Sequence, residues 1–295
     1  MGPTEILSRF VIDTKLEQIP EEVIHEAKRC FINYLGVSLG ALEEDGAKIL
    51  LEWIRAEGGV PNASIIGTGE RTTAVLAALA NGYLAHLLDY DDTHLPTILH
   101  PSAPIWPAVQ SVAEEQGLSG REALIAFAIG VEVASRLSLS VHPWHYDGGW
   151  HITGTAGIFG ATAAAGRLLG LSVPQMAHAF GIAGTQSSGV REVMGTMSKA
   201  LHAGKAASNG IQSATLALAG FTSAETILEG RRGFWAVLSP NGHDEAALTV
   251  NLKERWEIFN NGLKPYANGV VAHPLQDAAI NLRDIEGISP EKIAG

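Results

Sequence analysis

Apolar side chains recur at helical spacing along most of the chain. Between residues 4 and 16 they form one face of a predicted helix: Ile6, Leu7, Phe10 and Val11. A second helix is predicted to begin at Pro20, because proline suits the first turn of a helix. The acids Glu21 and Glu22 that follow suit the positive end of the helix dipole. The start of the chain is therefore predicted to be helical.

Three capping-box patterns predict further helix starts. In such a box, Ser or Thr pairs with Glu or Gln three residues later, and each side chain accepts from the other's backbone. The three boxes each precede an apolar run of helical period: Ser119 with Glu122, Ser172 with Gln175, and Thr222 with Glu225. A further apolar helix is predicted over residues 74–88.

Signals for β-strands are scarce. Residues 63–67 and 247–252 have the composition of short extended segments. The predicted fold class is therefore mostly α.

Two of the predicted helices are rich in small residues. Residues 154–170 read GTAGIFGATAAAGRLLG and residues 203–220 read AGKAASNGIQSATLALAG. A glycine inside a helix costs up to about 1 kcal/mol relative to alanine, so these glycines need a reason. Close packing between buried helices is the favoured explanation. The alternative is a pocket in which a ligand approaches the backbone.

A turn cluster at residues 239–242, Ser-Pro-Asn-Gly, predicts a domain boundary. We expect a large helical domain over residues 1–240, and a junction with the start of a smaller α+β domain over residues 241–295. Ser289 and Pro290 predict a helix start only a few residues before Gly295. The sequence is therefore expected to be a fragment of a longer protein.

Composition excludes several classes of protein. The 295 residues carry a net charge of −11 with a pI near 5.4, which argues against a nucleic-acid binder or a protein that docks on anionic membranes. A single cysteine, Cys30, excludes an internal disulfide framework and cysteine-rich zinc modules. The N-terminus has no apolar signal core, and the longest apolar run, residues 123–131, is too short to span a bilayer. We expect a soluble, cytoplasmic protein.

The densest polar cluster follows the helix predicted at residues 74–88. It reads Asp89-Tyr90-Asp91-Asp92-Thr93-His94, with His100-Pro101-Ser102 close behind. Three interpretations are open. The first is a metal site made by Asp89, Asp91, His94 and His100. The second is an acid–base site in which a carboxylate orients a histidine. The third is a solvated loop, although acids near a helix C-terminus oppose its dipole at a cost of roughly a few tenths of a kcal/mol each.

Three more clusters are locally basic. Residues 142–151 hold three histidines, and His151 lies just before a glycine-rich helix, where free N–H groups suit an anion. Residues 195–205 place Lys199 and His202 beside a helix that otherwise reads as buried. Lys264 and Tyr266 form the last cluster. Together these groups favour a small anionic substrate such as a polycarboxylate, with proton transfer at the carbon next to a carboxylate.

At these motifs the sequence resembles the MmgE/PrpD family. The matching stretches occur in the family's order: AHLLDYDDTHLPTILHPSAPIWPA, Trp150-His151 before GTAG, GTMSKALHAGKAASNG, and NGLKPYANGVVAH. The resemblance implies a large all-helical domain joined to a smaller α+β lid, with the active site between them. It also implies a homodimer that needs no metal or cofactor. The family chain is longer than this one, so the lid has only begun here.

The resemblance also implies the site residues. Asp89, Thr93, His100, His151, Lys199 and Lys264 match the family's active-site positions. In these roles His151 and His100 are the acid–base candidates, Asp89 orients one of them, and Lys199 and Lys264 bind carboxylates. Thr93, Tyr266 and His202 are expected to contact the substrate.

The chemistry that the resemblance implies is a carbanion next to a carboxylate. The expected activity is that of a lyase resembling 2-methylcitrate dehydratase of propionate metabolism. Iminodisuccinate epimerase, cis-aconitate decarboxylase and an inactive helical dimerisation fragment are the alternatives. After the K-P-Y lysine some members carry a cysteine pair, and the decarboxylase carries a histidine, whereas this sequence has Ala267-Asn268-Gly269. Without its lid, the fragment is expected to turn over weakly or not at all.

Overall fold

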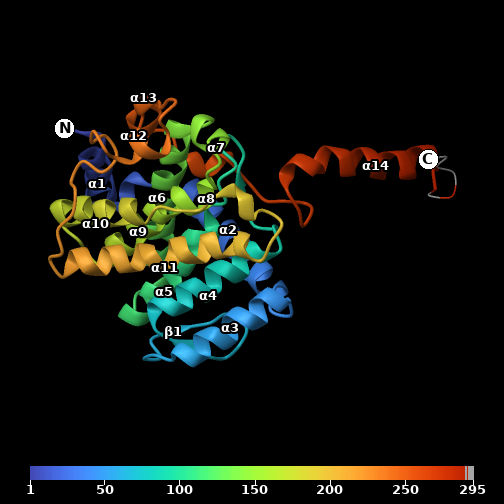
Figure 1. Ribbon diagram of the computed structural model, residues 1–295, viewed down its shortest axis with the longest axis horizontal. Helices are drawn as coiled ribbons and strands as arrows, with labels where there is room; N and C mark the ends of the chain where they lie inside the picture. Colours follow the sequence, from blue (N-terminus) through green and yellow to red (C-terminus); the bar gives the residue numbers. More distant parts are fainter. Residues whose placement is uncertain (290, 292–295) are drawn as a thin grey trace.

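The computed structural model describes residues 1–289 and 291, and the chain is mostly α-helical (Figure 1). The helices, with short 3-10 turns written η, are α1 (Pro3–Asp13), η1 (Leu16–Gln18), α2 (Glu21–Gly40), α3 (Asp45–Glu57), α4 (Ala74–Leu87), α5 (Ser102–Gln116), α6 (Gly120–Val141), α7 (Trp144–Asp147), α8 (Ile152–Thr155), α9 (Gly157–Leu168), α10 (Val173–Gln186), η2 (Arg191–Val193), α11 (Ser198–Leu218), α12 (Phe234–Leu238), α13 (Glu245–Thr249), η3 (Glu257–Asn260), η4 (Val270–Ala272) and α14 (His273–Glu286). The strands are β1 (Ala63–Ser64), β2 (Arg71–Thr72), β3 (Thr93–His94) and β4 (Asn261–Gly262).

The core lies between α4, α5, α6, α9 and α11, which pack against one another (Figure 1). Its large buried side chains include Phe127, Phe159 and Phe180. Among the described residues, α6 is long and apolar enough to cross a membrane, but 89% of its most apolar window is buried inside the fold. The apolar character of α6 is therefore used in the core of this body.

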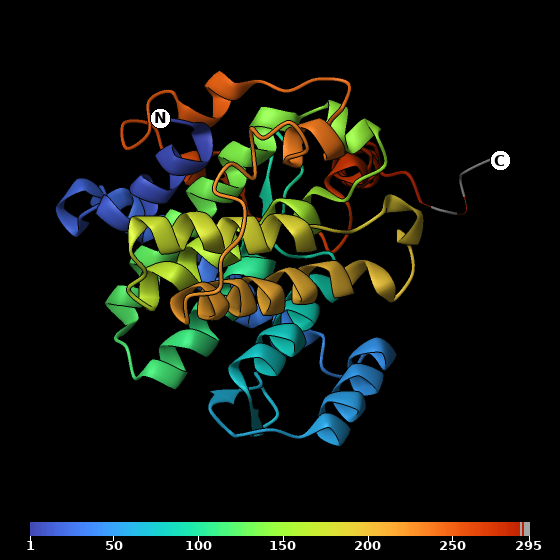
Figure 2. The ribbon, with the colours of Figure 1, turned by 60° about the vertical axis from the view of Figure 1, so that its left-hand side comes forward.

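The four short strands form two small antiparallel sheets. β1 and β2 pair Ala63 with Thr72 and lie with α3 on one flank, at the bottom of Figure 2. β3 and β4 pair Thr93 with Gly262. The second pairing brings the chain after residue 260 next to the polar cluster that follows α4.

The most extensive helix contact joins α4 and α11, and Gly82 and Gly204 lie within it. A Cβ added to Gly204 would stand 2.4 Å from the carbonyl oxygen of Leu79, and one added to Gly82 would stand 2.8 Å from the Cα of Gly204. The two helices run in opposite directions, so the end of α4 meets the start of α11. The small residues of the second glycine-rich helix thus allow backbones to touch, as the packing interpretation predicts.

A buried guanidinium holds the returning C-terminal segment on the body. Arg136 of α6 is fully buried and pairs with Glu132 one turn earlier. It donates to the carbonyl oxygens of Val250 at 2.6 Å, Asn251 at 3.1 Å and Arg255 at 2.9 Å. Glu132 in turn accepts from the backbone N–H of Glu257 at 2.7 Å. All three nitrogens of the guanidinium thus donate hydrogen bonds, which offsets the cost of burying its charge.

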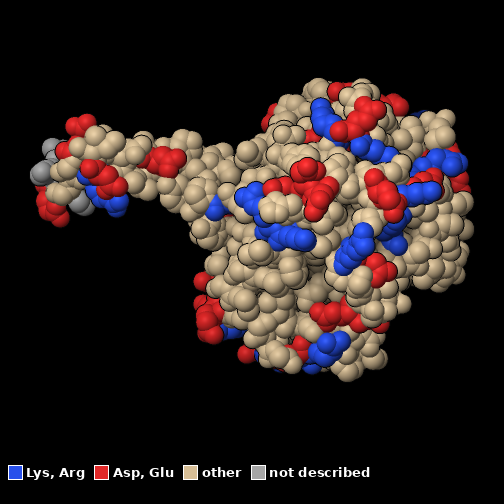
Figure 3. Space-filling model, turned by 180° about the vertical axis from the view of Figure 1, so that it is seen from behind, with Lys and Arg blue, Asp and Glu red and all other residues tan. Residues whose placement is uncertain are grey.

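The last described helix, α14, extends away from the body and has no buried residue (Figure 1). Figure 3 shows the same projection from behind, with acidic and basic side chains interspersed over the body. Residues 241–264 pack on the helical body through α13, η3 and β4. The predicted domain boundary near residue 240 stays a prediction, and the helix start at Pro290 lies outside the described residues.

Two of the three capping boxes are confirmed. Ser119 caps α6 and Ser172 caps α10, and each has its reciprocal partner in place. The helix predicted after Thr222 is wrong: residues 221–224 are irregular and residues 225–229 form turns. Here the backbone of Ser223 pairs with the His178 ring, and Gly181 of α10 leaves room for the carbonyl of Ala224. Tertiary contacts therefore override the local signal.

The two predicted extended segments had different outcomes. The segment at residues 63–67 is confirmed in part, because Ala63–Ser64 forms β1. The strand predicted at residues 247–252 is wrong, since its first residues lie in α13. The Asp244 side chain accepts from the backbone N–H groups of Ala246 and Ala247, at 2.9 and 3.3 Å. This N-cap starts a helix where apolar composition alone indicated a strand.

A methyl group at the contact between α4 and α11 should destabilise the fold. We expect Gly204→Ala to lower the free energy of unfolding by about 1–3 kcal/mol, because overpacking against backbone outweighs the helix propensity that alanine adds. Gly36 in α2 is the matched control, since nothing lies within 4 Å of an added Cβ there. Gly36→Ala should be neutral or stabilise by up to about 1 kcal/mol. Equal effects of the two substitutions in urea denaturation would contradict the packing account.

A buried histidine should make the fold sensitive to acid. Burial lowers the pKa of His145 to about 4, and its ring bonds the carbonyl of Leu238 and the hydroxyl of Thr155, both at 2.7 Å. Because the unfolded chain binds this proton more readily, stability is full above pH 6.5 and is lost as the pH falls towards 4. We expect His145→Gln to be less stable at pH 7 but to lose less stability over that interval. Parallel curves of unfolding free energy against pH for the variant and the wild type would show that His145 contributes nothing to the slope. The control is His25→Gln, at an exposed histidine, which should leave the slope unchanged.

Candidate active site

A small pocket opens where α4 ends and α11 begins. Its volume is about 160 Å³, and its lining gathers residues from four separate parts of the sequence: Asp89, Ile98, His100, Tyr146, His151, Met194, Lys199, Gly269, Val270 and Val271. The four predicted catalytic residues, Asp89, His100, His151 and Lys199, therefore meet at one cavity. No single cluster in the sequence contains all four.

Asp89, in the pocket lining, forms ion pairs with two lysines. Its backbone is left-handed, with φ of 51°, at the point where the chain leaves α4. The Lys264 ammonium donates to the Asp89 carbonyl oxygen and to Oδ1, both at 2.7 Å, and Lys199 Nζ lies 3.0 Å from the same Oδ1. Burial alone would raise the pKa of Asp89, but Lys199 and Lys264 outweigh burial and hold the pKa below its usual range. Two ammonium groups around one carboxylate leave an excess of positive charge.

A second carboxylate, Asp91, lies beside the histidines. Its Oδ2 is 2.7 Å from His86 Nδ1, and its Oδ1 is 3.4 Å from His100 Nδ1. The Asp91 and His86 side chains are at most 1% exposed. Asp89 was expected to orient a histidine, but it contacts the lysines, and Asp91 is the carboxylate at the imidazoles. Residues two apart in a loop that leaves a helix point in different directions.

His151 and His202 form a hydrogen-bonded pair of imidazoles. Their Nδ1 atoms are 2.9 Å apart, so one ring donates and the other accepts. The backbone N–H of His151 bonds the carbonyl of Gly189 at 2.9 Å, which ties the start of α8 to the loop after α10. Burial, together with the nearby His86 and His100, holds the pKa of His151 well below its usual value. His151 is therefore uncharged at neutral pH and can accept a proton.

The remaining residues of the DYDDT motif hold the loop in place. Asp92 is fully buried and accepts from the backbone N–H of Ser102 at 3.1 Å and from the Asn261 amide at 2.6 Å. It thereby ties the start of α5 to β4. Thr93 was expected to contact the substrate, but it is fully buried, and its hydroxyl lies 3.3 Å from His100 Nδ1.

None of the four residues predicted to bind the substrate lines the pocket: Thr93, Lys264, Tyr266 and His202. The Tyr266 hydroxyl donates to Asp277 on α14 at 2.5 Å, and Tyr266 is not among the residues that line the pocket. The alternative metal set is not assembled either, because the His94 ring turns to Thr97 and Glu257, at 2.7 and 3.2 Å. Within the described chain, the three side chains His86, Asp91 and His100 offer donor atoms within 4.8 Å of one another.

Sequence reasoning missed His86 and Tyr146. His86 stands one turn before Asp89 in a helix that is otherwise apolar and buried. A buried histidine in such a helix needs a polar partner, and that need was the available signal. Tyr146 lies in the histidine-rich connector. The Arg191 guanidinium stacks on its ring, with the guanidinium carbon 3.7 Å from the ring centroid.

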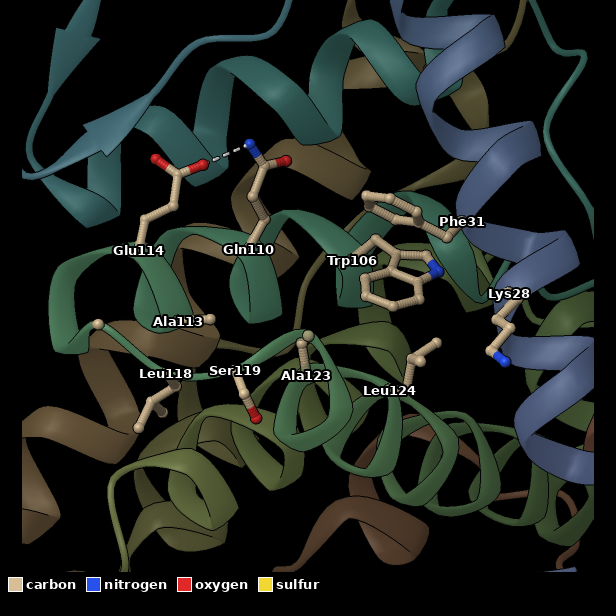
Figure 4. A pocket seen from close by; sticks show the side chains of 12 residues that line it. Lys28, Phe31, Trp106, Gln110, Ala113, Glu114, Leu118, Ser119, Ala123 and Leu124 are labelled. Carbon is tan, nitrogen blue, oxygen red and sulfur yellow. Dashed lines mark hydrogen bonds between the residues drawn. The ribbon is translucent and has the colours of Figure 1, made fainter. Parts of the chain in front are cut away.

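A larger cavity, of about 500 Å³, lies elsewhere between α2, α5 and the start of α6. Figure 4 shows Phe31 and Trp106 side by side at one end, and Gln110 bonded to Glu114 at the other. Its charged groups are Lys28 and Glu114, and Glu114 also accepts from the backbone of Ser64. This mostly apolar wall contains no imidazole and no second carboxylate. The acid–base groups are in the smaller pocket.

The chain matches a known family model and several known proteins. The model of the MmgE/PrpD N-terminal domain matches residues 5–246. The cis-aconitate decarboxylase of Aspergillus terreus is 28% identical over 96% of this chain and 60% of its own length. The enzyme of the same name from Homo sapiens is 27% identical over 95% of this chain and 59% of its own length. The one from Mus musculus is 27% identical over 98% and 60%.

The chain thus spans about 60% of the length of the curated relatives that it matches. The family model covers most of the helical body described above, including the segments that carry Asp89, His100, His151 and Lys199. This 295-residue chain belongs to the MmgE/PrpD family, through its N-terminal domain.

Proposed function

We propose that the protein to which this chain belongs is a lyase that acts on a small polycarboxylate through a carbanion next to a carboxylate. One observation carries the proposal: Lys199 and the imidazoles of His100 and His151 line a single pocket of about 160 Å³, and Asp89 in the same lining joins Lys199 to the ammonium of Lys264. Cations that bind a carboxylate beside a group that transfers protons are the minimum that this chemistry needs. The side chains present supply both, so we propose an enzyme that needs no cofactor.

Lys199 and Lys264 would bind and polarise the substrate carboxylates. Lys199 is the more accessible, with 19% of its side chain exposed against 1% for Lys264. We therefore assign the direct carboxylate contact to Lys199. Lys264 supports the site by holding Asp89, and it adds a second positive charge that stabilises negative charge developing on the substrate.

His151, which also lines the pocket, is the proposed proton-transfer group. A neutral imidazole accepts a proton from carbon in a dehydration or epimerisation. Once protonated, it can return the proton to carbon, because the anionic substrate beside it favours the charged form. His202 supports His151 through the Nδ1 pair.

The names of the relatives favour decarboxylation among these reactions. In that reaction the bond between carbon and one carboxylate breaks, CO₂ leaves, and the electron pair stays on carbon until an imidazolium delivers a proton. A dehydratase resembling 2-methylcitrate dehydratase would use the same carbanion to expel a β-hydroxide, and an epimerase would reprotonate it on the other face. Ala267-Asn268-Gly269 immediately precedes Val270, which lines the pocket. We therefore propose that these three residues determine which substrate is accepted. The homodimer and the cytoplasmic location expected from the sequence stay predictions.

The substrate class can be tested by proton exchange. The full-length protein and residues 1–295 are incubated in D₂O with cis-aconitate, 2-methylcitrate, citrate and iminodisuccinate, and the products are followed by NMR. We expect deuterium incorporation at the carbon next to a carboxylate with at least one substrate, and weaker or no turnover by residues 1–295. Absence of exchange with all four, from folded full-length protein, would contradict the proposal.

Removing the Lys199 ammonium should weaken substrate binding. We expect Lys199→Met to raise KM by roughly 10- to 150-fold, because a hydrogen bond to a charged group contributes about 1.5–3 kcal/mol. Lys205, exposed on the same helix six residues later, is the matched control, and Lys205→Met should leave KM unchanged. If both variants raised KM equally, the effect would come from overall charge and not from a contact in the pocket.

Removing the His151 imidazole should affect the chemical step. We expect His151→Gln to lower kcat by roughly 10²- to 10⁴-fold, the usual contribution of a positioned acid or base. KM should change little, because the lysines remain. A variant that kept its kcat and its deuterium exchange would exclude His151 as the proton-transfer group.

A further inference from the structure

The His100 ring has one nitrogen that is occupied and one that is free. Its Nδ1 faces two oxygens, Asp91 Oδ1 at 3.4 Å and Thr93 Oγ1 at 3.3 Å. Its Nε2 has no hydrogen-bond partner among the described residues, while the ring lines the pocket. The backbone N–H of His100 donates to the Thr153 hydroxyl at 3.1 Å, which fixes the base of the side chain. The ring is thus anchored on the Nδ1 side and open on the Nε2 side.

Asp91 is itself held by a second imidazole. His86 Nδ1 lies 2.7 Å from Asp91 Oδ2, which leaves Oδ1 to face His100. The His86 ring packs against His100 with centroids 4.8 Å apart, and against His151 with centroids 5.5 Å apart. It therefore fixes the carboxylate and also separates the two acid–base rings. Asp91 Oδ1 makes no conventional hydrogen bond in this structure, and catalytic contacts of this kind often shorten when substrate binds.

We propose that Asp91, fixed by His86, is a positioning residue that sets the tautomer of His100, so that Nδ1 carries the proton and Nε2 presents its lone pair to the substrate. The arrangement resembles the orienting carboxylate of a catalytic triad, which selects a tautomer without taking a proton itself. Its catalytic meaning rests on the proposed function. The tautomer itself is a property of the folded protein and does not depend on turnover.

The charges of Asp91 and His86 agree with this arrangement. Despite its burial, the pKa of Asp91 is held well below its usual value by the two imidazoles, so Asp91 accepts hydrogen bonds as an anion at neutral pH. Burial lowers the pKa of His86 to about 4, so His86 donates as a neutral ring and adds no cation to the pocket. A carboxylate between two imidazole rings can receive an N–H from each.

The tautomer can be read directly by long-range ¹H–¹⁵N NMR on full-length protein labelled with ¹⁵N-histidine. His100 is assigned as the signal lost in His100→Gln. We expect the wild-type ring to be protonated at Nδ1 and not at Nε2, and this single form to be lost in Asp91→Asn. A wild-type ring protonated at Nε2 would overturn the proposal, as would an unchanged ring in a folded Asp91→Asn protein.

Glu257→Gln is the matched control. Glu257 is also a buried carboxylate paired with a buried imidazole, that of His94 at 3.2 Å, but neither residue lines the pocket. Glu257→Gln should leave the His100 signal and kcat unchanged, even if it lowers stability. If it changed the tautomer as Asp91→Asn does, the effect would be general loosening of the fold and the specific role of Asp91 would be wrong.

Kinetics and metal analysis complete the test. We expect Asp91→Asn to lower kcat by roughly 10²- to 10⁴-fold with KM unchanged, because the lysines stay in place. The expected tautomer without any turnover would overturn the proposed function alone, whereas turnover with the wrong tautomer would overturn the role of Asp91 alone. Stoichiometric metal in the wild-type protein that is absent from Asp91→Asn would show that His86, Asp91 and His100 bind an ion instead.

Discussion

The contact between α4 and α11 is the constraint on which the site depends. Because Gly82 and Gly204 carry no side chains, the two backbones approach more closely than a Cβ would allow. The helices run in opposite directions, so their near ends bring Asp89 and Lys199 to 3.0 Å although 110 residues separate them along the chain. The small residues of α11 thus serve packing and, through packing, set the spacing of the charged groups. A pocket of this size has little room for error in that spacing.

Neighbouring carboxylates in this loop have different surroundings and therefore different tasks. Asp89 is partly exposed and is surrounded by ammonium groups. Asp91 is buried among imidazoles. Asp92 is buried among neutral donors, and its burial raises its pKa. The same side chain thus holds cations, faces imidazoles or fastens a loop, according to what it contacts.

Local signals in the sequence predicted most of the fold. The caps at Ser119 and Ser172, and the start near Pro20, are short-range features whose energetics do not depend on distant contacts. The failures at Thr222 and at residues 247–252 came from contacts and a cap that the apolar pattern does not encode. For the site, polar residues in an apolar context marked the right clusters, because burying them without partners is costly. Their pairing could not be predicted, since the direction of Asp89 depends on a left-handed backbone, and His86 looked like a core residue.

The capture of the returning segment by Arg136 links catalytic competence to the completion of folding. Lys264 reaches Asp89 across 175 residues, whereas Arg136 meets Val250 across 114. Closing long loops costs conformational entropy before any contact rewards it. Once the guanidinium holds residues 250–255, the remaining search for Lys264 covers only a short tether. A chain that has formed its helical body but has not docked residues 250–264 lacks Lys264 beside Asp89. Such partially folded molecules would lack one of the two positive charges that the proposed chemistry uses.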